Sequence, residues 1–132
     1  MSKGGSGLFK GTNGSTAEVW NNISATQPNY AGTELPRSFV MKTPENSFWV
    51  HGNATEHMAD YLIKQSNSGR SLGSTKLDAQ LMLSDMRSSI TRVTKDGIIY
   101  NTPLKDGNWE FVIKPSRNKS EYDLIIHAMY KK

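Results

Sequence analysis

The sequence predicts an α+β domain in which two helices pack on an antiparallel β-sheet. Two observations favour this class. Two segments with the apolar spacing of helices lie together in the middle of the chain, and segments that read as strands lie on both sides of them. The expected element order is therefore β-β-α-α-β-β-β. With 132 residues, the chain is most simply one domain, large enough to form a core without disulfides or a structural metal.

The first 37 residues differ in composition from the rest of the chain. They are rich in Gly, Ser, Thr and Asn and have only scattered apolar positions, which is typical of a linker or of an arm laid over a core. We therefore expect residues 1–37 to be a loosely ordered N-terminal arm or a linker remnant. The domain itself is expected to span residues 38–132.

The first elements of the domain are a hairpin and a short helix. Residues 38–42 and 47–51 read as strands, because Thr43-Pro44-Glu45-Asn46 between them is a good four-residue hairpin loop. A helix is expected over 53–65, where Asn53 and Glu56 have the spacing of an N-cap and its capping box. A polar loop at 66–74 ends this part of the chain.

A longer helix and three strands complete the expected fold. The helix begins at Thr75, carries apolar residues at alternating intervals of four and three, and ends at Lys95-Asp96-Gly97. Strands are expected at 98–100, 108–114 and 122–130. The middle one has the clearest pattern, since apolar Trp109, Phe111 and Ile113 alternate with Glu110, Val112 and Lys114. Asp106-Gly107 closes the loop before it, and a polar loop at 115–121 follows it.

Composition excludes several function classes. The absence of cysteine removes thiol nucleophiles, disulfide frameworks and cysteine-ligated zinc. No window has the apolar length of a membrane span, and the N-terminus lacks the apolar stretch of a secretion signal. The formal net charge of +4 gives a moderate attraction for polyanions, above all nucleic acid.

The segment from His51 to His57 carries the strongest chemical signal. It places two imidazoles where a strand passes into a helix. Free backbone N–H groups and the positive end of the helix dipole gather at such a junction and favour a phosphate there. The third histidine, His127, is expected in the last strand, on the same face as Asp123 and Ile125. Each histidine also has a simpler interpretation as a hydrogen-bonded structural residue.

Most enzyme classes lack their motifs in this chain. There is no His-Glu-x-x-His helix, no carboxylate cluster, no Gly-x-Ser-x-Gly elbow, and no Walker-type or dinucleotide-binding glycine pattern. We therefore expect neither a metal nor a cofactor. The chemistry left is metal-free RNA cleavage, in which the ribose 2′-hydroxyl is the nucleophile and the protein supplies a base, an acid and groups that bind phosphate.

The histidines are the first candidates for the proton transfers, because imidazole exchanges protons near neutral pH. His51 and His57 are the leading pair, His127 is a third candidate, and Glu110 is an alternative base on the sheet. The candidates for phosphate and substrate contact are Thr55, Arg70, Lys114 and Arg117.

Three stretches resemble a known group of domains. They are residues 48–58 (FWVHGNATEHM), 107–111 (GNWEF) and 127–130 (HAMY). Over about residues 38 to 130 the chain is similar to the C-terminal toxin domains of bacterial polymorphic toxins, such as the contact-dependent growth inhibition effectors. Many of those domains are small nucleases of the barnase, EndoU, colicin and RelE type. The early hairpin departs from the simplest form of that fold, in which helices precede the sheet.

The resemblance implies a ribonuclease toxin, with tRNA among its candidate substrates. Such a domain would be delivered as part of a larger secreted or cell-surface effector and would act in the cytoplasm of the target bacterium. The producing cell would be protected by an immunity protein, which we expect to be acidic because the domain is basic. The alternative is a non-catalytic module that binds nucleic acid or protein and whose histidines are structural.

Overall fold

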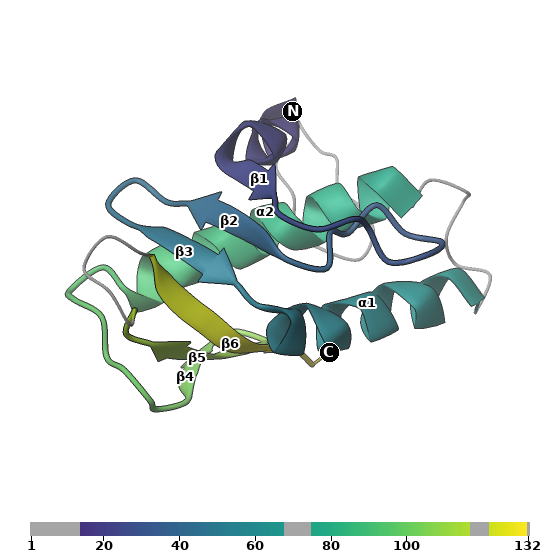
Figure 1. Ribbon diagram of the computed structural model, residues 1–132. Coiled ribbons are helices and arrows are strands. Elements are labelled where there is room, and N and C mark those ends of the chain that lie inside the picture. The colour runs from purple at the N-terminus through teal and green to yellow at the C-terminus, as the bar shows by residue number, and fades with distance from the viewer. Residues whose placement is uncertain (1–13, 68–74, 117–121, 132) are drawn as a thin grey trace.

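A computed structural model describes residues 14–67, 75–116 and 122–131 of the chain. These residues form a six-stranded sheet in the order β1-β2-β3-β6-β5-β4, together with three helices (Figure 1). The elements are η1 (Gly14–Asn22, a 3-10 helix), β1 (Ile23–Ala25), β2 (Phe39–Lys42), β3 (Ser47–Val50), α1 (Gly52–Asn67), α2 (Thr75–Val93), β4 (Leu104–Asp106), β5 (Trp109–Lys114) and β6 (Asp123–Tyr130).

The predicted α+β class is confirmed. Neighbouring strands pair antiparallel at every position but one, because β3 and β6 run parallel to each other. The predicted hairpin is β2 and β3, and both predicted helices and the last two predicted strands lie within two residues of their expected ends. The predicted element order lacks the two elements that precede the hairpin, η1 and β1.

The strand predicted at 98–100 is wrong. Those residues are irregular, and Ile99 is 58% exposed. The strand that pairs with β5 on the side away from β6 is β4, which begins six residues after Ile98. Gly107 has a φ of +58°, so the chain turns tightly there and places the residues just before it opposite β5. A short apolar run does not form a strand where no partner strand lies beside it.

The described part of the N-terminal arm is packed on the domain. Val19 of η1 is 3% exposed and Leu35 is fully buried, and both belong to the main hydrophobic core. β1 adds a strand to the edge of β2, and the Trp20 indole Nε1 donates a 2.9 Å hydrogen bond to Gln80 of α2. The scattered apolar residues of the arm therefore cover the core, which favours the arm over the linker remnant for residues 14–37.

The core lies on one face of the sheet. Its strand residues pack against α2, which lies behind the sheet in Figure 1. α1 continues from β3 and runs beside the second half of β6, where β3 has ended. In the described part of the chain, no helix lies over the other face. We call it the open face; it carries Val40, Trp49, Glu110, Val112, Lys114 and Leu124.

One ion pair joins α2 to β4 on the core side. Arg92 Nη2 lies 2.7 Å from Asp106 Oδ2, and the buried Ser89 hydroxyl donates a 2.7 Å hydrogen bond to the same oxygen. The hydrogen bond from Arg92 is the main cause that lowers the pKa of Asp106, and that from Ser89 adds to it. Because the carboxyl has a lower pKa folded than unfolded, it stabilises the fold above its unfolded pKa. That stabilisation is lost as the pH falls through the folded value.

We expect Asp106→Asn to lower the free energy of unfolding by about 1 kcal/mol at neutral pH, a modest value because the Arg92 side chain is 59% exposed. The difference should shrink as the pH falls below about 4, the ordinary value of an Asp carboxyl, and vanish once Asp106 is itself neutral. Urea unfolding followed by circular dichroism at neutral pH and at an acidic pH measures it. An equal difference at both pH values would contradict the assigned role of the charge.

Candidate active site

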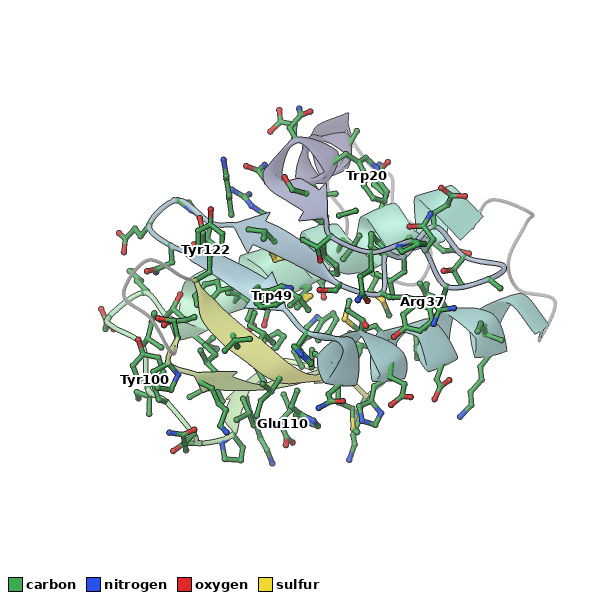
Figure 2. All side chains as sticks on the ribbon, viewed as in Figure 1. Trp20, Arg37, Trp49, Tyr100, Glu110 and Tyr122 are labelled. Atoms are coloured by element: carbon green, nitrogen blue, oxygen red, sulfur yellow. The ribbon has the colours of Figure 1, made fainter. Side chains whose placement is uncertain are left out.

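Three side chains from three elements meet on the open face: Glu110 from β5, His127 from β6 and His57 from α1. His127 Nε2 lies 3.5 Å from Glu110 Oε2, and the centroids of the two imidazole rings are 5.7 Å apart in an edge-to-face arrangement. The His127 and Glu110 side chains are 27% and 33% exposed, and His57 is exposed. We call this group the imidazole cluster. Figure 2 labels Glu110 on β5, in the lower part of that view.

A β-bulge brings His127 to this face. Val112 lies opposite His127, but the next residue of β5, Ile113, lies opposite Ile125, so β6 contains one extra residue at Ile126. Simple alternation would put His127 on the same face as Ile125, which is in the core. The prediction that His127 shares the face of Asp123 and Ile125 is therefore wrong. The bulge reverses the alternation and aims the imidazole at Glu110.

The start of α1 places His57. The His51 carbonyl accepts the backbone N–H groups of Ala54 at 2.9 Å and Thr55 at 3.1 Å, so His51 caps the helix and the predicted cap at Asn53 is wrong. Ala54 and Met58 are buried and hold α1 against the core. His57 is exposed and lies over β6, because α1 runs beside the half of that strand that contains His127.

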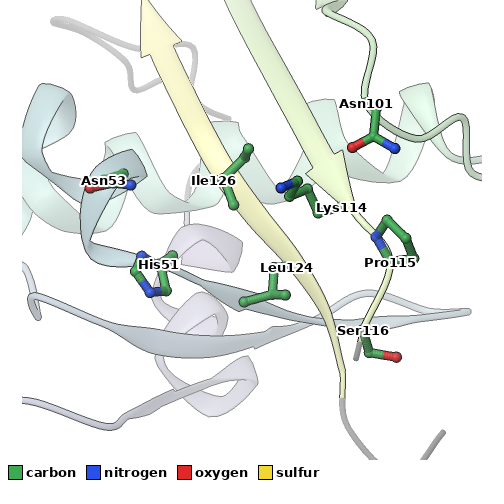
Figure 3. Close-up of a pocket in the computed structure, with 8 residues that line it drawn as sticks. All are labelled: His51, Asn53, Asn101, Lys114, Pro115, Ser116, Leu124 and Ile126. Atoms are coloured by element: carbon green, nitrogen blue, oxygen red, sulfur yellow. The ribbon is translucent and has the colours of Figure 1, made fainter. Parts of the chain in front are cut away.

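His51 lies in a different environment. Its ring packs edge-to-face on Trp49 at 5.8 Å, and its backbone N–H donates a 3.0 Å hydrogen bond to Ile125 O. Its side chain lines a pocket together with Asn53 and Lys114 (Figure 3). The structure therefore separates the predicted leading pair. His57 lies with His127 and Glu110, which were the third candidate and the alternative base, whereas His51 lines the neighbouring pocket.

Thr55 faces the interior. It is fully buried, and its Oγ1 lies 2.8 Å from the Tyr30 hydroxyl and donates to Arg37 O at 2.7 Å. The Arg37 guanidinium also lies over the Tyr30 ring, 4.8 Å from its centroid. Thr55 thus ties the N-terminal arm to α1, and its hydroxyl is not presented to a phosphate.

The predicted cations are only partly described. Lys114 is exposed on the open face, whereas Arg70 and Arg117 lie outside the described residues. Lys105, which the sequence reasoning missed, lies directly opposite Glu110 in the β4–β5 pair and is exposed. Because the strand was predicted at 98–100, Lys105 was not recognised as a strand residue. The turn signal at Asp106-Gly107, applied to both sides of the turn, would have found it.

Among the described residues, no three or more His, Asp or Glu side chains are grouped as metal ligands. No helix in the described ranges is long and apolar enough to cross a membrane. Comparison of the chain with models of protein families gives no match, and comparison with curated proteins gives no significant match either. The candidate function therefore depends on the geometry of the site and on the resemblance noted above.

Proposed function

We propose that this domain is a metal-independent endoribonuclease and that the imidazole cluster is its active site. The observation that carries the proposal is the position of His127, which has Glu110 within 3.5 Å of its Nε2 and a second imidazole beside it. A carboxylate beside one ring nitrogen favours the tautomer that carries its proton there, which leaves the other nitrogen free to accept a proton. His127 is thereby suited to be the base, and His57 the acid.

The reaction requires two proton transfers. His127 Nδ1 takes the proton of the ribose 2′-hydroxyl, and O2′ attacks the adjacent phosphorus. The bond from phosphorus to the departing 5′-oxygen breaks, and His57 gives that oxygen its proton. The products are a 2′,3′-cyclic phosphate and a free 5′-hydroxyl, so atoms and charge balance without an external co-reactant.

The open face also supplies cations for the charge that develops on the phosphorane. Lys105 lies opposite Glu110, and Lys114 lies on the same face of β5, two residues beyond Val112, which is opposite His127. Both lysines are exposed and therefore accessible to RNA. DNA has no 2′-hydroxyl, so the same groups favour RNA as the substrate. As a toxin in a target cell, the domain would require an immunity protein in the producer.

We expect the purified domain to cleave total bacterial RNA in the presence of EDTA, because the base, the acid and the cations all come from side chains. A gel of the products, with the cyclic phosphate detected by mass spectrometry, measures this. An oligonucleotide with deoxyribose at every position is the control and should remain intact. If EDTA abolishes cleavage and zinc or magnesium restores it, the metal-free mechanism is wrong.

A further inference from the structure

A pocket of about 480 Å³ opens on the open face, beside the imidazole cluster. Figure 3 shows its floor, formed by Leu124 and Ile126 of β6, with Lys114 rising from β5 and His51 and Asn53 from the junction of β3 and α1. Asn101, Pro115 and Ser116 complete the lining. Its volume is in the range of small-molecule sites, and an apolar floor with a few polar groups around it is their usual composition.

The far rim of the pocket is held by specific contacts. Asn101 adopts the left-handed conformation, with a φ of +60°, and its N–H donates a 2.8 Å hydrogen bond to Ile113 O. The neighbouring Tyr100 hydroxyl donates to Asp123 Oδ2 at 2.7 Å, and the Ser116 N–H donates to the other oxygen of that carboxylate at 3.0 Å. The two loops that form this rim are thereby tied to the start of β6.

The pocket and the cluster are adjacent along the strands. Ile126 immediately precedes His127, and the bulge places both near Val112 on β5. Lys114 is two residues beyond Val112 on the same face, which corresponds to about 7 Å along the strand. That length is close to the separation of successive phosphates in an extended RNA strand. A phosphate at His127 would therefore have its neighbouring nucleotide over the pocket.

The lining matches an unpaired base. The side chains of Leu124, Ile126 and Pro115 offer apolar contact to the flat face of a base, and the amides of Asn53 and Asn101 can both donate to and accept from its edge. Lys114 and His51 also line the pocket, and the Lys114 ammonium attracts the RNA backbone beside it. In a duplex the faces and edges of the bases are occupied, so only a single-stranded segment can enter.

We propose that this pocket, which we call the base pocket, binds the unpaired base next to the scissile phosphate, so that the enzyme acts on single-stranded RNA. The proposal deepens the proposed function and rests on it for the position of the scissile phosphate.

The test uses oligonucleotides that are 2′-O-methylated except at one ribose, so that a single linkage can be cleaved. Three oligonucleotides are compared. One has all its bases, one lacks the base on the 5′ side of that linkage, and one lacks the base on its 3′ side. Removing the base on one side should lower kcat/KM by about 5- to 150-fold. Ile126→Ala should cause a similar loss with the intact oligonucleotide and little further loss with the abasic one. Ile63→Ala, an exposed isoleucine of α1, is the matched control and should behave as the parent.

Two additional measurements keep the outcomes separate. Asn53→Ala removes an exposed side chain of the pocket and serves if Ile126→Ala does not fold. Fluorescence anisotropy with fully 2′-O-methylated strands measures binding without cleavage. Equal cleavage of intact and abasic strands would overturn the base pocket and leave the nuclease standing. If nothing is cleaved, the proposed function fails. The ratio of the dissociation constants of intact and abasic strands, measured by anisotropy, then tests whether the pocket binds a base. Binding of a duplex as tight as that of a single strand would also overturn it.

Discussion

Replacing His127 with alanine should lower the rate of RNA cleavage by about 10²- to 10⁴-fold, which is the usual contribution of one general acid or base. Thermal stability should change little, because the imidazole is partly exposed and its carboxylate neighbour stays accessible to water. Cleavage of a labelled single-ribose oligonucleotide, together with the melting temperature of each variant, measures both effects. His57→Ala should cause a loss of the same order, since the second proton transfer depends on it.

His51→Ala is the control that separates the two candidate pairs. Its side chain lies with Trp49 at the pocket, so we expect a smaller loss, in substrate binding more than in turnover. If His51→Ala loses most of its cleavage activity while His127→Ala cleaves like the parent, His51 and not His127 is the base. Unfolding of His127→Ala at ordinary temperature would instead indicate a structural histidine.

Trp109→Ala should lower the free energy of unfolding by about 3 to 5 kcal/mol, a large share of the stability of a small domain. Trp109 is 3% exposed, stacks on Phe111 at 5.3 Å and meets the Tyr130 ring edge-to-face at 5.2 Å. Its Nε1 also donates a 2.8 Å hydrogen bond to Asp85 of α2. Truncation therefore removes a ring that joins β5 and β6 to the long helix.

Trp109→Phe is the matched variant, because it keeps an aromatic ring and removes the N–H. It should lower the free energy of unfolding less, by about 1 to 3 kcal/mol, since its main effect is to remove the N–H that donates to Asp85. Urea unfolding followed by far-ultraviolet circular dichroism compares the two variants with the parent. A Trp109→Ala stability within about 1 kcal/mol of the parent would contradict the central position of this ring.

Sequence patterns were informative where neighbours along the chain decide the structure. The hairpin of β2 and β3 follows from its four-residue loop, where Thr43 exchanges hydrogen bonds with Asn46. The apolar spacing of α2 and the alternation of β5 correctly identified their buried faces. Trp109 is in the core, whereas Tyr100 and Tyr122 are exposed, 37% and 47%.

Elements whose partners are distant in the chain were not predictable in this way. β6 pairs in parallel with β3, which lies more than seventy residues earlier, and β1 pairs with β2 across the arm. Local composition carries no information about such partners. The strand predicted at 98–100 was therefore wrong, and the sequence did not predict η1 and β1 within the arm, because burial depends on which surface lies opposite.

The sequence by itself determined the class of fold, the main helices and strands, and the set of groups with chemical capacity: three histidines, Glu110 and several cations on a basic chain without cysteine. Only the tertiary structure decided which of them meet. One extra residue at Ile126 moves His127 from the core face to the open face, beside Glu110 and His57. Side chains alternate along a strand with a period of two, so a shift of one residue reverses every following side chain. Such a shift is set by the pairing of β6 with β5, which periodicity within β6 does not reveal.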